Sequence, residues 1–344
     1  MSVHAVVCHT VLGSLVSLLP KSPGHVEAVR FEYREPHMGT QCRIVLYTVD
    51  EQSASSAARA AFSRIARLDA ILSDYREDSE LMQICGKSGC DPVVAGQELF
   101  TVLDRAQQLS RSTDGAFDVT VDPVVRLWRQ ARRQHRLPEA SRLAEARSLV
   151  GYRNLVLDQD HRTVRLLRRG MRLDLGGIAK GYAADEAMSE LKKCGVTSAL
   201  VAMGGDIVVS APPPDQEGWI IGVAAPGGVQ PSLIESLVLH DAAVSTSGDS
   251  EQFVEIDGTR FSHIVDPRTG MAVVGRSNVT VTARQGIASD SLATAVSVLG
   301  PDAGLRLIES IPDAAALIVQ ATQQGQEIIE STRFKTLARR PATH

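Results

Sequence analysis

Apolar positions recur at two spacings along this chain, and the two spacings predict a mixture of helices and strands. A period of about 3.6 residues predicts helices at residues 53–72, 95–110, 123–134, 143–150, 182–194, 289–299 and 302–309. Alternating or short continuous apolar runs predict strands at residues 30–33, 41–48, 155–157, 163–173, 199–203, 207–209, 219–224, 234–239, 243–246, 252–256 and 279–283. We expect a polar loop over residues 73–92. These elements predict an α+β fold with mixed or antiparallel sheets and packed helices.

The same patterns set the limits of the folded region. We expect one domain over residues 29–335, with residues 336–344 as a C-terminal tail. Residues 5–19 are mostly apolar and precede a segment with two prolines, like the core of an export signal and its linker. Because no Lys or Arg precedes this run and His9 interrupts it, residues 1–28 are either a leader or a disordered N-terminus. We favour an exported, periplasmic or membrane-associated protein over a cytoplasmic one.

The composition argues against several classes of protein. An apolar content of 44% and a charged content of 22% are ordinary for a soluble globular chain. The net charge of −4 argues against nucleic acid as the main partner, because binding to its backbone needs a basic face. The five cysteines are odd in number and contain no Cys-x-x-Cys pair, which argues against a disulfide framework or a structural zinc site.

The segment Asp174-Leu-Gly-Gly-Ile-Ala-Lys-Gly-Tyr182 is the most informative one for chemistry. It joins a predicted strand to a predicted helix, with a carboxylate, two adjacent glycines and Lys180 near the helix N-terminus. Backbone N–H groups and the helix dipole favour an anion there, and Lys180 adds positive charge, so the expected ligand is phosphate. The spacing matches neither the phosphate loop of nucleotide hydrolases nor the three-glycine dinucleotide fingerprint. The alternative is a tight turn with a solvated lysine.

Asp290 and Thr294 form an oxygen-rich pair in a predicted helix. They are four residues apart, so their side chains lie on one face about one turn apart. A carboxylate and a hydroxyl together suit a hard cation such as Mg²⁺. The alternative is an acidic residue that favours the helix dipole, with Thr294 simply packed.

Three other segments place a histidine or an aromatic ring in polar surroundings. His263 ends a strand close to Asp266 and a Pro-Arg-Thr-Gly turn, which suits proton transfer or a phosphate contact as well as a structural role. Tyr75 lies in the polar loop, where it either stacks on a nucleotide base or is an ordinary surface tyrosine. Phe117, in a glycine-containing turn, is free to pack on a ring.

Taken in order, these motifs resemble the ApbE family, the flavin transferases that attach FMN to proteins. The resemblance runs from about residue 30 to about residue 330, and its glycine-lysine and His-x-x-Asp-Pro-x-Thr-Gly motifs are specific. The matching residues are Met38-Gly-Thr40; Leu72-Ser-Asp-Tyr75; Ser79-Glu-Leu81; Thr113-Asp-Gly-Ala-Phe-Asp118; Pro123 and Trp128; the glycine-lysine segment with Asp185; Gly204-Gly-Asp206; Trp219, Gly222 and Pro226; Ser245-Thr-Ser-Gly248; His263-Ile-Val-Asp-Pro-Arg-Thr-Gly270; and Asp290-Ser-Leu-Ala-Thr294.

The resemblance implies a T-fold-like architecture with the active site in a cleft between two lobes. It implies an Mg²⁺-dependent reaction in which FAD is cleaved, AMP is released and FMN is joined through a phosphoester bond to a threonine or serine. The acceptor would be a target protein, such as a subunit of a membrane redox complex. By position, the FAD contacts would be Met38, Tyr75, Ala116, Phe117, Asp118, Asp174, Lys180 and Ile264. The metal ligands would be Gly177 through its carbonyl, Asp290 and Thr294.

Two residues are candidates for the proton transfer that such a reaction needs. His263 and Asp290 could each accept the proton of the incoming hydroxyl, and we expect His263 to assist transfer while Asp290 is chiefly a metal ligand. An Mg²⁺-dependent FAD pyrophosphatase would use the same residues with water as the acceptor. A non-catalytic FAD-binding protein would need neither the metal ligands nor His263, and all of these residues are present.

Overall fold

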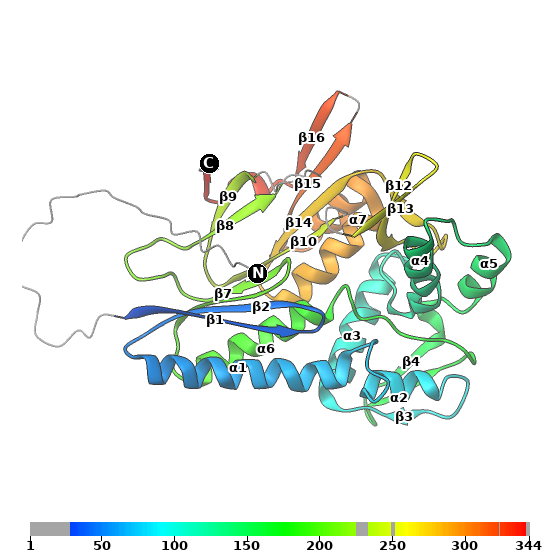
Figure 1. The fold of residues 1–344 in the computed structure, drawn as a ribbon, viewed down its shortest axis with the longest axis horizontal. Helices are drawn as coiled ribbons and strands as arrows, with labels where there is room; N and C mark the ends of the chain where they lie inside the picture. The colour runs from blue at the N-terminus through cyan, green and yellow to red at the C-terminus, as the bar shows by residue number, and fades with distance from the viewer. Residues whose placement is uncertain (1–27, 225–232, 249–251, 323, 342–344) are drawn as a thin grey trace, which may run out of the picture.

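The centre of the protein is an eight-stranded antiparallel sheet. The computed structural model describes residues 28–224, 233–248, 252–322 and 324–341. The strand order is β1-β2-β6-β7-β10-β14-β15-β16, and every neighbouring pair runs antiparallel (Figure 1). The strands are β1 (Val29–His37), β2 (Thr40–Thr48), β6 (Ser198–Met203), β7 (Asp206–Val209), β10 (Ala242–Gly248), β14 (Ser277–Ala283), β15 (Ala315–Thr322) and β16 (Gly325–Glu330).

Both faces of this sheet are buried, because successive side chains of a strand point to opposite sides. In β2, Ile44 and Leu46 enter one core, whereas Val45 enters the core on the other side. The first face is covered by α1 (Glu51–Leu72), α6 (Ala179–Lys193) and α7 (Gly286–Glu309). Figure 1 shows α1 and α6 running along that face. The second face is covered by a small sheet of β8 (Trp219–Ala224), β9 (Leu233–Leu239) and β17 (Arg339–Pro341).

Helices and two further small sheets gather at one end of the large sheet (Figure 1). They are α2 (Glu80–Gly86), α3 (Gln97–Ser112), α4 (Asp122–Gln134), α5 (Ala140–Ser148), β3 (Val93–Val94), β4 (Leu155–Asp158), β5 (Thr163–Leu166), β11 (Phe253–Ile256), β12 (Thr259–Val265) and β13 (Ala272–Val274). Trp128 of α4 packs on Phe261 of β12, and its indole Nε1–H donates a hydrogen bond to the Gly270 carbonyl at 2.9 Å. The apolar face of α4 is therefore fixed against the segment that contains His263.

The predicted α+β class is confirmed, while several predicted elements need correction. The polar loop predicted over residues 73–92 contains α2, which begins where the Ser79 hydroxyl accepts a hydrogen bond from the Met82 N–H. That helix is too short for its apolar period to stand out. The strand predicted to reach residue 173 ends at Leu166. The two helices predicted after residue 288 form α7, which is kinked at Gly300 where φ is 75°. Strands β3, β13, β15, β16 and β17 were not predicted, and β12 was predicted only as a strand that ends at His263.

Two predictions concern the ends of the chain. Residues 1–27 of the predicted leader lie outside the described residues, as does Pro226 of the matching motifs. Part of the segment predicted as a tail, residues 336–344, contributes β17, which pairs with β9. Among the helices that the structure describes, none combines the length and the hydropathy needed to cross a membrane.

Glu32, on the edge strand β1, should make stability depend on pH. Burial alone would raise its pKa, but the guanidinium groups of Arg34, Arg30 and Arg43 outweigh this and lower the pKa from 4.5 to about 2. The ion pairs therefore stabilise the folded state fully above pH 4.5, and this contribution is lost as the pH falls towards 2. Glu32→Gln should lower the free energy of unfolding at pH 7 by up to about 1 kcal/mol, a size typical of exposed ion pairs.

Urea denaturation at pH 7 and pH 3 tests this prediction. The difference between wild type and Glu32→Gln should shrink at pH 3, where part of the wild-type contribution is gone. Glu35→Gln, on the same strand and exposed, is the matched control and should change stability less. An equal difference at both pH values would contradict the assignment.

Candidate active site

The turn before α6 is built by the carboxylate of Asp174. Its Oδ1 accepts a hydrogen bond from the Gly176 N–H at 2.8 Å, which closes a tight turn two residues long. Gly177 and Ile178 follow, and α6 begins at Ala179. The predicted arrangement of a glycine turn at a helix N-terminus is therefore present, with Lys180 in the first turn of the helix.

Helices α6 and α7 cross in direct backbone contact at their N-termini. A Cβ atom on Gly181 would lie 2.0 Å from the Gly286 carbonyl oxygen and 2.7 Å from the Cβ of Asp290, so only glycine fits there. The Gly181 N–H donates to Asp290 Oδ2 at 2.9 Å. The carboxylate of Asp185 in turn accepts the N–H groups of Gly286 and Ile287 at 2.7 and 2.9 Å. This crossing brings Lys180 and Asp290, which are 110 residues apart in sequence, to 4.0 Å.

Gly181→Ala should destabilise the protein strongly, because the clash is with backbone atoms that cannot rotate away. We expect the free energy of unfolding to fall by about 3 kcal/mol, at the upper end for overpacking. Urea denaturation measures the loss. Gly86→Ala in α2 is the control, since its added Cβ would meet no atom within 4 Å. An unchanged denaturation midpoint for Gly181→Ala would show that the two helices are not in this contact.

Lys180, Asp206 and Asp290 form a charged cluster beneath this crossing. Lys180 Nζ lies 2.5 Å from Asp206 Oδ2 and 4.0 Å from Asp290 Oδ2, and both carboxylates are buried. Burial, followed by the negative charge of Asp206, raises the pKa of Asp290 to about 7, against the opposing effect of Lys180. Burial alone would lower the pKa of Lys180, but Asp290 and Asp206 outweigh it and raise this pKa. The cluster thus contains one buried carboxylate more than its lysine can neutralise.

The three predicted metal ligands lie close to this cluster. A Cβ on Gly177 would come within 2.8 Å of Thr294 Oγ1, so the glycine backbone approaches that hydroxyl closely. Thr294 Oγ1 is also 3.4 Å from the hydroxyl of Ser247. Thr294 follows Asp290 by one turn of α7, as the spacing predicted. The structure therefore gathers Gly177, Lys180, Asp290 and Thr294 from two segments at the α6–α7 crossing.

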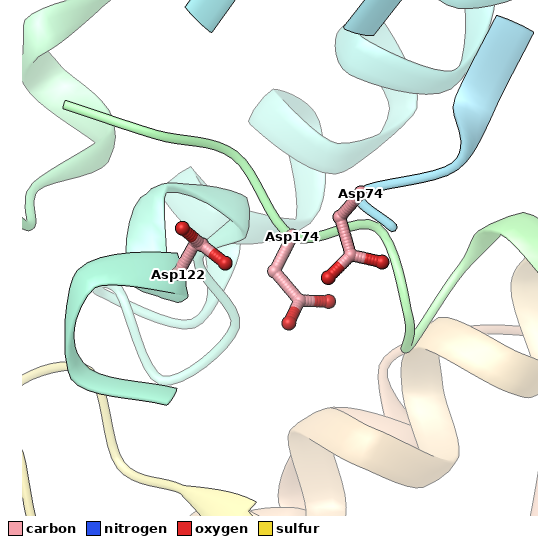
Figure 2. Close-up of side chains that lie close together, drawn as sticks. All are labelled: Asp74, Asp122 and Asp174. Carbon is pink, nitrogen blue, oxygen red and sulfur yellow. The ribbon is translucent and has the colours of Figure 1, made fainter. Parts of the chain in front are cut away.

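A second cluster of carboxylates lies on the other side of the Asp174 turn. One carboxylate oxygen each from Asp74, Asp122 and Asp174 lies within 4.8 Å of the others, and Figure 2 shows Asp174 between the other two. Arg129 bridges Asp74 and Asp174 at 2.8 and 2.9 Å. Asp122 accepts from Arg126 and Arg172, both at 2.9 Å. Three arginines balance the charge of the three carboxylates, so the cluster is chiefly a network of ion pairs, in which Asp122 Oδ1 is buried without a hydrogen-bond partner.

The structure places Tyr75 beside this second cluster. The residue is 76% exposed, and the Arg129 guanidinium lies over its ring at 4.7 Å from the ring centroid. Tyr75, Asp74 and Arg129 all line an open cavity of about 860 Å³. Burial and the charge of Asp74 together raise the pKa of Asp174 to about 6, against the effect of Arg129. Two predicted FAD contacts, Tyr75 and Asp174, are thus linked through one arginine.

Four other predicted FAD contacts have different surroundings. Met38 occupies the β1–β2 turn with φ at 48° and packs against the core under α1. Ala116 and Phe117 are buried, and Phe117 belongs to that same core. Asp118 is buried and accepts hydrogen bonds from the N–H and hydroxyl of Thr120 and from the Tyr152 N–H. In this structure the Asp118 carboxylate is therefore occupied by Thr120 of its own turn and by Tyr152 of a later segment.

His263 and Ile264 lie together near the end of β12. The His263 N–H donates to the Gln252 carbonyl at 3.0 Å, and the ring Nδ1 lies 3.2 Å from the same oxygen. A ring nitrogen facing a carbonyl carries the proton, which directs the basic lone pair of a neutral imidazole to Nε2. The Ile264 N–H donates to the Ser262 hydroxyl at 3.1 Å. No contact links His263 to Lys180 or Asp290 among the interactions of the described residues.

Sequence reasoning missed three residues of the site. Asp206 occurs in the matching Gly-Gly-Asp motif but received no role, although its carboxylate lies closer to Lys180 Nζ than that of Asp290. Asp74 precedes Tyr75 and likewise received none. Arg129 lies in a helix with several other arginines. Nothing in the sequence distinguishes it from them except that it directly follows Trp128. Its role depends on two carboxylates that lie 55 and 45 residues away in the chain.

Comparison with known proteins agrees with this geometry. A model of the ApbE family matches residues 38–318. An FAD:protein FMN transferase from Klebsiella pneumoniae (strain 342) is 32% identical over 290 residues, covering 84% of this chain and 89% of that protein. One from Treponema pallidum (strain Nichols) is 32% identical over 313 residues, covering 86% of each chain.

Solved structures give the same result. The ApbE protein from Thermotoga maritima aligns with a TM-score of 0.80 at 31% identity, covering 91% of this chain and all of that one. The flavin transferase ApbE from Vibrio cholerae aligns with a TM-score of 0.79 at 26% identity, covering 90% and 100%. The motifs, the fold and these relatives coincide over most of the chain, and it therefore belongs to the ApbE family and is a transferase.

Proposed function

We propose that this protein is an Mg²⁺-dependent FAD:protein FMN transferase. It would cleave the pyrophosphate of FAD, join FMN through a phosphoester bond to a threonine or serine of an acceptor protein, and release AMP. The observation that carries the proposal is the α6–α7 crossing, which places Lys180, Asp290 and Thr294 beside a helix N-terminus. A pyrophosphate needs positive charge, which Lys180 and the dipole of α6 supply, and oxygen ligands for a cation.

The residues present fit a magnesium ion. Mg²⁺ prefers oxygen ligands, and the Gly177 carbonyl, the Asp290 carboxylate and the Thr294 hydroxyl supply three from two segments held in contact. The cluster has a buried carboxylate in excess over Lys180, so a cation would complete its charge balance. When bound, the ion would supply Lewis-acid stabilisation of the phosphate oxygens.

The chain's own residues would do the remaining work. Lys180 and the N-terminus of α6 would hold the pyrophosphate and neutralise its charge. His263 would accept the proton of the acceptor hydroxyl through Nε2, as its oxygen bonds to the flavin-side phosphorus and the bond to the AMP phosphate breaks. Asp174 and Tyr75 would position the nucleotide at the neighbouring cavity. The bridging oxygen would leave with AMP, and the proton held by His263 would pass to this AMP phosphate or to solvent, which balances the step.

Two other activities would use the same site. A pyrophosphatase would place water where the acceptor hydroxyl enters and would yield FMN and AMP. A binding protein would hold FAD without turnover. The names of the relatives favour transfer, and the buried acidic cluster at the α6–α7 crossing favours turnover over binding alone.

One assay separates the three activities. The purified protein is incubated with FAD, Mg²⁺ and an acceptor domain bearing an exposed threonine, followed by intact-mass measurement of the acceptor and quantification of AMP. An acceptor that gains the mass of an FMN phosphoester, with AMP released in equal amount, supports the transferase. AMP and free FMN with every tested acceptor unmodified support the pyrophosphatase. Bound FAD without AMP supports a binding protein.

A further inference from the structure

We infer that Arg129 is a positioning residue that sets the affinity for FAD by holding Tyr75 and Asp174 in place. The inference deepens the proposed function and rests on it, because these two residues are its predicted FAD contacts. Arg129 comes from α4, Tyr75 from the loop after α1, and Asp174 from the turn before α6. One side chain thus joins three segments around one site.

The geometry of Arg129 fits this role. Its Nη1 donates to Asp74 Oδ2 at 2.8 Å and its Nη2 donates to Asp174 Oδ2 at 2.9 Å, while its guanidinium covers the Tyr75 ring at 4.7 Å. A planar guanidinium can bind two carboxylates and an aromatic face at once, whereas a lysine ammonium is a single point charge. The two hydrogen bonds to the carboxylates are part-buried, where charged hydrogen bonds are stronger than at the surface, whereas the Tyr75 ring stays exposed.

The two sides that Arg129 joins are each fixed elsewhere. Helix α4 is anchored by Trp128, whose indole donates to the Gly270 carbonyl. The Tyr75 loop is closed at its base, where the buried Ser79 hydroxyl donates to the Ser73 carbonyl at 2.7 Å. The other oxygen of Asp174 fixes the Gly176 turn. Arg129 therefore fixes the exposed end of the loop, where Tyr75 lines the cavity.

Removing Arg129 would affect binding rather than chemistry. Asp74 and Asp174 have carboxylate oxygens within 4.8 Å of each other and would face one another without a shared cation. The Tyr75 ring would lose the group that covers its face and would have to be ordered by the ligand, at a cost in affinity. The Lys180–Asp290 cluster has no ion pair with Arg129 among those of the described residues, so turnover of bound FAD should change little.

The test measures FAD binding and turnover separately. Flavin fluorescence gives the Kd for FAD, and AMP release gives KM and kcat, for wild type and for Arg129→Ala. We expect Kd and KM to rise about tenfold, which corresponds to the loss of one hydrogen bond to a charged group, with kcat changed less than about twofold. Arg129→Lys keeps the charge and can keep one carboxylate contact, so its Kd and KM should lie between those of wild type and Arg129→Ala. This variant also decides the question if Arg129→Ala does not fold.

Two comparisons make the result specific. Arg136→Ala removes an exposed charge just beyond α4 and should leave Kd unchanged. The effects of Arg129→Ala and Tyr75→Ala on Kd should combine to less than their product, because both disturb one contact. An unchanged Kd, a fall in kcat alone, or fully multiplicative effects would each overturn the role of Arg129 while leaving the transferase intact. Wild-type protein that neither binds nor cleaves FAD would overturn the proposed function, and this inference with it.

Discussion

Asp290→Asn is expected to abolish FAD cleavage while leaving the protein folded. Mutating a residue that only contacts a metal ligand already lowers metal affinity or activity by about 10- to 100-fold. Loss of a ligand itself should therefore lower AMP release by more than about 100-fold. The amide keeps an oxygen that can accept the Gly181 N–H, which Asp290 Oδ2 accepts at 2.9 Å. Since burial and Asp206 disfavour the charged form of Asp290, removing its charge should not lower stability.

The assay measures AMP release against Mg²⁺ concentration, together with the thermal midpoint of unfolding. The control is Asp302→Asn, an exposed aspartate in the same helix beyond the kink at Gly300, which should retain wild-type rates. Full activity of Asp290→Asn at the same Mg²⁺ concentration would show that the metal assignment is wrong. A large fall in the thermal midpoint would show that the carboxylate is needed for folding instead.

His263→Ala is expected to abolish transfer of FMN to the acceptor while leaving FAD bound. A positioned general base contributes about 10²- to 10⁴-fold to such a reaction, so flavinylation should fall by at least about 100-fold. His263 lies in β12, exposed, and its Nδ1 faces the Gln252 carbonyl. Its removal leaves the Lys180–Asp206–Asp290 cluster unchanged, and the Kd for FAD should therefore stay close to that of wild type.

Intact-mass measurement of the acceptor over time gives the transfer rate, and flavin fluorescence gives the Kd. His240→Ala is the matched control, because His240 is also exposed but lies at the end of β9 against Asp241. Transfer at the wild-type rate by His263→Ala would assign the proton to another group, with Asp290 as the first candidate. A large loss of FAD affinity would instead make His263 a binding residue.

The sequence by itself determined the fold class and the chemistry carried by local motifs. The turn from Asp174 to Lys180 could be predicted because its carboxylate, glycines and helix start act within a few residues. The same holds for Asp290 and Thr294, whose relation depends only on the helical repeat. The edge strands β16 and β17 were missed, since their pairing with β15 and β9, not their own patterns, makes them strands.

Only the tertiary structure decided how these motifs meet. The contact between Gly181 and Gly286 brings Lys180 to Asp290, and nothing in either helix alone indicates that crossing. Arg129 acquires its role from Asp74 and Asp174, which reach it from distant segments. Local sequence fixes hydrogen bonds and side-chain faces within a turn or a helix. The balance of charges in a buried cluster depends on distances between segments, and packing alone sets those distances.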